Sequence, residues 1–123
     1  MAYRVVVADD ESEFSEWLCL LLDKSKDFEV VGQAHYGGDA IYLIVSTKPD
    51  VVIADIHMPE PDGLEVTRYV HQHLPDIKVI LISAYKEPIY ERLAREEGTV
   101  ALIPKSKLSL DALLQALQEE AQP

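Results

Sequence analysis

Five short runs rich in valine and isoleucine recur along the chain and constrain its fold more than any other feature. They are RVVVA (4–8), FEVVGQA (28–34), DVVIA (50–54), IKVILIS (77–83) and VALIP (100–104). The middle runs are almost continuously apolar, which is typical of strands that are covered on both faces. Strands of this kind belong to parallel sheets whose connections are helices, so the intervening segments should be helical.

The segments between the runs repeat apolar residues with a helical period. The first segment has an unbroken apolar face, formed by Phe14, Trp17, Leu18, Leu21 and Leu22. Its continuity predicts that Trp17 fills the core and does not mark a partner site. Shorter apolar faces predict two helices that end before Pro49 and Pro75, and a last helix that begins after Ser109.

The segment between the fourth and fifth runs has the weakest helical pattern. Glu87 is a candidate cap, Pro88 suits the first helical turn and Gly98 suits the C-terminal stop. Its inward face is thin, with Ile89, Leu93 and Ala94 as the candidates. We therefore expect this helix to be the most loosely held and the readiest to shift.

Strands alternating with helices predict an α/β fold, a doubly wound five-stranded parallel sheet of order 2-1-3-4-5 and flavodoxin-like type. The length suits one domain over residues 1–123. Pro104 supports this order, because proline is tolerated in an edge strand and the fifth strand lies at an edge.

The chain is strongly acidic, with 11 lysines and arginines, 22 aspartates and glutamates and a formal net charge of −11. Such a surface repels nucleic acid and anionic lipid, so we expect no direct nucleic-acid contact and no membrane contact. Cys19 is the single cysteine, which leaves no internal disulfide. Because no segment resembles a leader or a membrane span, we expect a cytoplasmic protein.

Polar residues of complementary chemistry follow four of the five runs. Asp9 and Asp10 follow the first run, Asp55 follows the third, Ser83 ends the fourth and Lys105 follows the fifth. Ligands of this sheet type bind beyond the carboxyl ends of the strands, at the switch point between strands 1 and 3. The predicted topology therefore brings these residues to one rim of the sheet.

Three carboxylates at one rim repel one another, and either protonation or a bound cation has to relieve the repulsion. Oxygen ligands that leave room for water and phosphate suit Mg²⁺ better than zinc or copper. Lys105 supplies a second positive charge for an incoming phosphoryl group, and Ser83 could donate a hydrogen bond to it. Asp55 is then placed to act as a nucleophile that forms an acyl phosphate.

Each of these residues taken alone has a plainer interpretation. An acidic pair after a strand often forms a solvated turn and helix cap. A single lysine in this place is usually exposed, and a serine such as Ser83 usually satisfies local backbone. The functional interpretation depends on the convergence of four strand ends.

The segments VVVADDE, VVIADIHMPEPDG, LISAY and IPKS occur in an order and spacing that resembles the receiver domains of two-component response regulators. The resemblance covers essentially the whole chain. It implies that Asp55 is the phosphoryl acceptor, that Asp9 and Asp10 hold Mg²⁺, and that His57 ligates the metal through its backbone carbonyl.

The resemblance also implies roles for residues at the fourth and fifth strands. Ser83 matches the switch hydroxyl, Ala84 leaves room for a phosphodonor, and Lys105 pairs with the phosphoryl group. The position that is usually aromatic and coupled to this hydroxyl is Leu102, and Tyr85 is a candidate substitute. The IPKS form is similar to receivers joined to helix-turn-helix DNA-binding domains.

The function that we expect from this resemblance is a phosphorylation-controlled switch. Asp55 receives a phosphoryl group from a sensor histidine kinase, and a surface around the fourth helix, fifth strand and fifth helix changes. An output domain or an effector protein reads that surface, and a homodimer through the same region is implied. The chain would catalyse only its own phosphorylation and dephosphorylation.

Two other functions remain open. One is an interaction module with the same fold that is not switched by phosphate, which Leu102 weakly favours. The other is a phosphatase of the haloacid dehalogenase type. That class needs a second acid two residues after its nucleophile, where this sequence has His57, and a cap for which the chain has no room.

Overall fold

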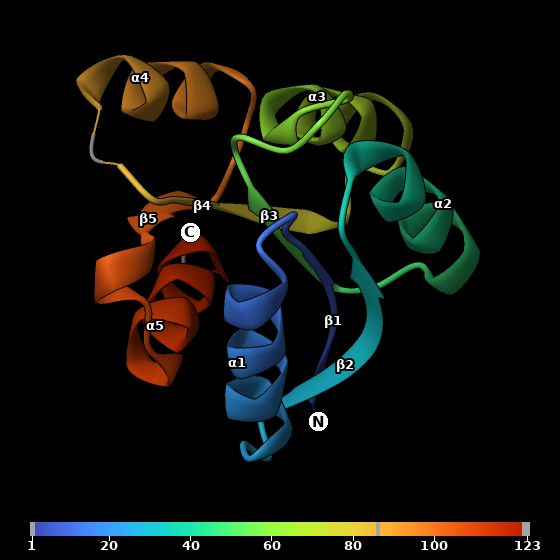
Figure 1. Cartoon of the computed structure of the whole chain (residues 1–123), viewed down its shortest axis with the longest axis vertical. Helices are drawn as coiled ribbons and strands as arrows, with labels where there is room; N and C mark the ends of the chain where they lie inside the picture. The colour runs from blue at the N-terminus through green and yellow to red at the C-terminus, as the bar shows by residue number, and fades with distance from the viewer. Residues whose placement is uncertain (1, 86, 122–123) are drawn as a thin grey trace.

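The strands form one parallel sheet of order β2-β1-β3-β4-β5 in the computed structural model, which describes residues 2–85 and 87–121 (Figure 1). Within these residues the sheet has five strands: β1 (Tyr3–Ala8), β2 (Phe28–Ala34), β3 (Val51–Asp55), β4 (Lys78–Ser83) and β5 (Ala101–Pro104). Each begins and ends within one residue of a predicted run. The predicted fold class and strand order are confirmed, and β5 with Pro104 lies at an edge.

Helices cover both faces of the sheet. In the described residues they are α1 (Ser12–Asp23), α2 (Gly37–Thr47), α3 (Gly63–His73), α4 (Pro88–Glu96), the 3₁₀ turn η1 (Lys105–Lys107) and α5 (Leu110–Ala121). Figure 1 shows α1 and α5 on one face and α2, α3 and α4 on the other. None of the helices in the described part of the chain is long and apolar enough to cross a membrane.

The core consists of two layers, one on each side of the sheet. Successive residues of β1 point to opposite layers: Val5 and Val7 pack with α1 and α5, whereas Val6 and Ala8 pack with α2, α3 and α4. All four of these side chains are fully buried. Burial on both faces explains why the strands are continuously apolar.

The inward face of α1 is narrower than its sequence predicts. Leu18 and Leu22 are fully buried, but Trp17 is 45 % exposed, so its predicted core position is wrong. Trp17 lies about 100° around the helix from Leu18, beyond the strip that the sheet covers. Its ring packs instead against Phe14, with ring centroids 5.4 Å apart.

The predicted thin face of α4 is confirmed, but one of its members is wrong. Among the α4 residues, all of them described, Ala94 alone is buried. The Ile89 side chain is 53 % exposed, because the side chain of the next residue, Tyr90, is the one that points toward the sheet and packs on the core.

Of the three signals predicted for the ends of α4, the proline and the glycine are confirmed and the capping side chain is not. Pro88 occupies the first helical turn, and Gly98 follows the helix with a left-handed φ of 87°. Glu87 is the N-cap residue, but its side chain makes no capping hydrogen bond.

The loop after β3 brings the first residue of α3 back against the end of β3. The carboxylate of Asp62 accepts a hydrogen bond from the Glu65 backbone N–H at 2.9 Å, and Glu65 accepts one from the Asp62 N–H at 3.3 Å. This capping box starts α3 at Gly63. A Cβ atom at Gly63 would lie 2.5 Å from the carbonyl oxygen of Asp55 and 2.7 Å from the Ile56 Cα.

We expect Gly63→Ala to lower the free energy of unfolding by about 1–3 kcal/mol, because backbone has to move to admit the methyl group. The matched control is Gly38→Ala in α2, where a Cβ atom would meet its nearest neighbour at an ordinary 3.5 Å. Urea titration of the two variants measures the difference. Equal stability of the two would contradict the tight approach of α3 to β3.

Candidate functional site

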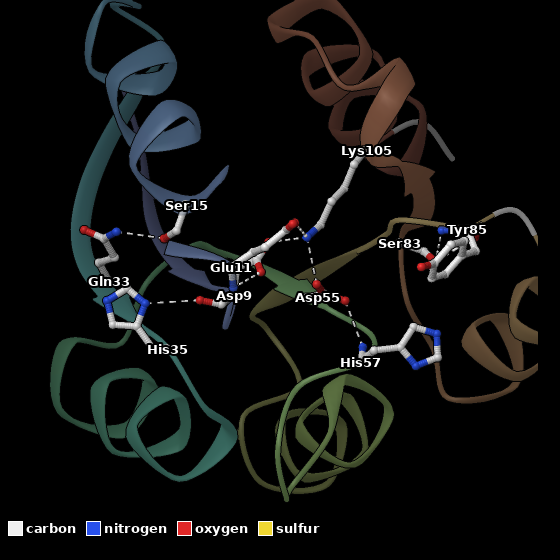
Figure 2. A network of polar contacts seen from close by, with 10 residues as sticks. All are labelled: Asp9, Glu11, Ser15, Gln33, His35, Asp55, His57, Ser83, Tyr85 and Lys105. Atoms are coloured by element: carbon white, nitrogen blue, oxygen red, sulfur yellow. Dashed lines mark hydrogen bonds and ion pairs between the residues drawn. The ribbon is translucent and has the colours of Figure 1, made fainter. Parts of the chain in front are cut away.

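The carboxyl end of the sheet brings three acidic residues, Asp9, Glu11 and Asp55, into contact with one lysine. Asp9 follows β1, Asp55 ends β3, and Lys105 follows β5 at the edge of the sheet. Glu11 is the residue before α1, and Asp10 lies between it and Asp9. Figure 2 shows the Lys105 side chain extending from the start of η1 to the acids.

The ammonium group of Lys105 is the centre of this cluster. Its Nζ lies 2.8 Å from Asp9 Oδ2, 2.9 Å from Asp55 Oδ2 and 2.9 Å from Glu11 Oε1. The same Nζ lies 4.5 Å from the ring centroid of Phe14, close enough for a cation–π contact. The Lys105 side chain is only 10 % exposed, so its contacts with the buried Asp9 and Asp55 are shielded from solvent.

Burial and charge shift the pKa values within the cluster in a consistent way. Burial of Asp9 raises its pKa to about 6, and the charge of Asp55 adds to this shift. The Lys105 ammonium and the Glu11 backbone N–H, which donates to Asp9 Oδ1 at 2.8 Å, oppose it. Burial also disfavours the charge of Lys105, but the three carboxylates outweigh it and raise the pKa of Lys105, so the lysine stays cationic.

The acids fit a hard divalent cation. One oxygen each of Asp9, Asp10 and Asp55 lies within 4.8 Å of the others. Asp9 Oδ2 is buried and accepts no hydrogen bond within the described residues, although it forms the ion pair with Lys105. Carboxylate oxygens in this arrangement are the ligands that Mg²⁺ prefers.

His57 contacts Asp55 through its backbone and points its ring elsewhere. Its N–H donates to Asp55 Oδ1 at 2.8 Å. Its ring is directed away from the acids (Figure 2) and meets the ring of Tyr90 edge to face, with centroids 4.8 Å apart and an interplanar angle of 90°. The role of its carbonyl as a metal ligand stays a prediction.

Ser83 is buried but bonds to its own loop. Its hydroxyl donates to the Tyr85 carbonyl at 2.7 Å and accepts from the Tyr85 N–H at 3.2 Å. Tyr85 itself is 69 % exposed and Ala84 is exposed. Leu102 pairs with Leu81 of β4 and packs partly buried on the layer that includes α4.

Three contacts of the site were missed in the sequence. The sequence does not single out Glu11, which is a direct partner of Lys105. Phe14 is predicted only as part of an apolar helix face, and no pattern marks Tyr90 as the neighbour of His57. The sequence carries no signal for these contacts, because each joins segments that only the fold brings together.

Comparison with known proteins identifies related regulators. A family model described as the response regulator receiver domain matches residues 5–118. The transcriptional regulatory protein DegU of Brevibacillus brevis is 33 % identical over 119 residues, which are 97 % of this chain and 50 % of that protein. The probable transcriptional regulatory protein NarL of Mycobacterium tuberculosis is 37 % identical over 102 residues, 83 % of this chain and 47 % of that protein. The chain thus spans about half the length of these relatives.

Solved structures with the same fold come from the same kind of protein. The signal receiver domain of the putative response regulator NarL from Mycobacterium tuberculosis superposes with a TM-score of 0.89 at 32 % identity, covering 98 % of both chains. A LuxR-family DNA-binding response regulator from Staphylococcus aureus superposes with a TM-score of 0.87 at 30 % identity, covering 95 % of this chain and 97 % of that one.

We expect Asp9→Asn to stabilise the chain at pH 7.5 in the presence of a chelator. The pKa of Asp9 rises from 3.8 to about 6 on folding, so the ionised carboxylate opposes folding. The gain should be about 1–2 kcal/mol, less than the full shift implies, because one amide oxygen cannot face both Lys105 and the Glu11 N–H as the two carboxylate oxygens do. Well below pH 3.8, at about pH 3, the carboxyl is mostly protonated in both states, and the gain should nearly vanish.

Urea unfolding at pH 7.5 and at about pH 3 measures this difference, with Asp10→Asn as the exposed control. A variant that is less stable than the unaltered chain at pH 7.5 would contradict the raised pKa.

Proposed function

The chain belongs to the response regulator receiver domain family, and we propose that it is a phosphorylation-controlled switch with Asp55 as the phosphoryl acceptor. The observation that supports this role is the environment of its carboxylate. Asp55 Oδ2 lies 2.9 Å from Lys105 Nζ, and the acids that fit a divalent cation surround it.

The proposed reaction is transfer from a phosphorylated histidine of a sensor kinase. A carboxylate oxygen of Asp55 forms a bond to phosphorus while the P–N bond breaks. The leaving imidazole nitrogen keeps the electron pair of the broken bond and takes up one proton supplied by the buffer. The products are an aspartyl phosphate and a neutral histidine, and the chain acts by positioning and charge neutralisation.

Mg²⁺ would be held by carboxylate oxygens of Asp9, Asp10 and Asp55 and by the backbone carbonyl of His57. When bound, it neutralises negative charge on the acceptor and on the phosphoryl oxygens. It would also favour the ionised form of Asp9, whose burial otherwise favours the protonated form.

Lys105 is the second positive group in this proposal. Its ammonium faces Asp55 already and would contact a phosphoryl oxygen after transfer. To do so it has to leave one of its present partners. Glu11 is the one to be released, because its side chain is 64 % exposed whereas Asp9 is fully buried.

The switch itself is assigned to Ser83. Its hydroxyl would exchange the Tyr85 backbone, its present partner, for a phosphoryl oxygen. The exposed and small Ala84 leaves room for the donor to approach. A change of the loop between β4 and α4 would then alter the surface of α4, β5 and α5.

The names of similar proteins support a choice of partners for this switch. Several of them are named transcriptional regulatory proteins and are about twice as long as this chain. We infer that a sensor histidine kinase supplies the phosphoryl group and that an output domain or effector protein reads the changed surface. The present chain would act either as a monomer or as a homodimer. The net charge of −11 argues against direct contact of this chain with nucleic acid.

A phosphorylation-independent interaction module is the alternative, and Leu102 is the observation that favours it.

A relative from Pyrococcus abyssi is named protein-glutamate methylesterase/protein-glutamine glutaminase, but the match covers only 32 % of that protein. We infer that the present chain is regulatory and not itself such an enzyme.

Incubation with Mg²⁺ and acetyl phosphate should add the mass of one phosphoryl group to the chain. The group should be absent from Asp55→Asn and suppressed by a chelator, because both the acceptor and the metal are required. Intact-mass spectrometry measures the labelled fraction. The matched control is Asp76→Asn, an exposed acid in the turn before β4.

An unlabelled chain with its fold intact would contradict the switch and leave the interaction module. Label that persists in Asp55→Asn would contradict the choice of acceptor.

We expect Glu11→Gln to accelerate labelling by acetyl phosphate several-fold. The substitution removes a negative charge near the donor and weakens the hold on Lys105. The initial rate of mass gain measures this effect, with Glu13→Gln as a control on an exposed part of α1. A slower Glu11→Gln variant would show that Glu11 assists the reaction.

A further inference from the structure

The two ends of α4 are attached to the rest of the protein in different ways. Just after its C-terminal end, Glu97 forms a two-pronged ion pair with Arg68 of α3, at 2.8 and 3.0 Å. Thr99 also donates its hydroxyl to the Ala94 carbonyl at 2.9 Å. Ala94 is fully buried beside these contacts. The C-terminal half of α4 is therefore held against α3 and the sheet.

The N-terminal half of α4 is held by one ring. Pro88 and Ile89 are exposed, as is the cap residue Glu87. In this half of the described helix, Tyr90 is the residue that packs on the core, and its ring meets the His57 ring at 4.8 Å. An edge-to-face pair of this geometry contributes beyond its buried area.

The His57 end of this contact is tied to the proposed acceptor. His57 donates its N–H to Asp55 Oδ1 at 2.8 Å, a charge-assisted hydrogen bond. After phosphorylation of either Asp55 oxygen, the carboxylate becomes an acyl phosphate and Oδ1 is no longer a charged acceptor. The bond to His57 weakens, and the ring that touches Tyr90 is carried on the same residue.

Leu102 and Tyr85, the two residues considered for coupling to Ser83, do not connect the loop after β3 to α4 through a ring. Leu102 has no ring, and it lies on β5. Tyr85 is 69 % exposed and contacts Ser83 through its backbone alone among the hydrogen bonds of the described residues. Tyr90 is the aromatic residue that joins the loop after β3 to α4.

We propose that Tyr90 is a positioning residue that transmits phosphorylation of Asp55 to the N-terminal half of α4 through the ring of His57. This inference rests on the proposed function, because it needs Asp55 to be the acceptor. It assigns the motion to one end of α4, with the Arg68–Glu97 ion pair holding the other.

Hydrogen exchange of the α4 amides, with and without Mg²⁺ and beryllium fluoride as the phosphoryl mimic, tests the relay. In the unaltered chain the exchange rate of the first α4 turns should change by about two- to tenfold, the equilibrium equivalent of one aromatic pair. Tyr90→Leu keeps an apolar side chain but lacks the ring and should lose most of this change. Tyr90→Phe, which keeps the ring, and Tyr85→Leu should retain it.

Acetyl phosphate labelling of Asp55 in Tyr90→Leu should stay within twofold of the unaltered chain. If Tyr90→Leu does not fold by circular dichroism, His57→Leu at saturating beryllium fluoride removes the other ring and has to lose the same response.

A full α4 response in folded Tyr90→Leu would overturn the relay. Equal loss in Tyr90→Leu and Tyr90→Phe would also overturn it, because the hydroxyl and not the ring contact would then be responsible. A chain that is labelled on Asp55 but whose α4 does not respond overturns the relay alone. A chain that is never labelled overturns the proposed function and the relay with it.

Discussion

The ion pairs of Lys105 are the interaction on which the rest of the site depends. One ammonium group contacts carboxylates from the ends of β1 and β3 and from the start of α1. Without it, Asp9 and Asp55 would be buried anions with no counter-charge, which is costly in a protein interior. Even with it, the acids exceed the available positive charge, and burial raises the pKa of Asp9. The excess negative charge is what makes the site fit a divalent cation.

The loop after β3 links this charge balance to the surface of the protein. It leaves the sheet at Asp55, places the His57 N–H on the Asp55 carboxylate, and returns so closely that Gly63 has no space for a side chain. A loop held so tightly at both ends can pass a change at Asp55 to its outer residues. The contact of His57 with Tyr90 extends the same path to α4.

Stability is distributed unevenly around the site. Every residue of β3 and the last four residues of β1 are buried, whereas α4 contributes one buried residue among those described. Ser83 is bonded to the neighbouring loop backbone and not to Asp55. Elements with few buried contacts open at a low free-energy cost, and moving parts of regulatory proteins come from such elements. The rigid sheet holds the chemistry in place, and the weakly packed helix is free to respond.

The architecture and the acidic and basic residues at the strand ends could be predicted from the residue pattern alone. Continuously apolar strands required a parallel sheet, and the residues after those strands named Asp9, Asp55 and Lys105 as neighbours. Periodicity carries this information because a strand or helix repeats its buried face over many residues. Individual contacts could not be predicted in this way: Trp17 turns outward, Tyr90 and not Ile89 turns inward, and Ser83 bonds to Tyr85. A pattern cannot specify these choices, because each depends on the width of the face that a neighbouring element covers and on partners from distant segments.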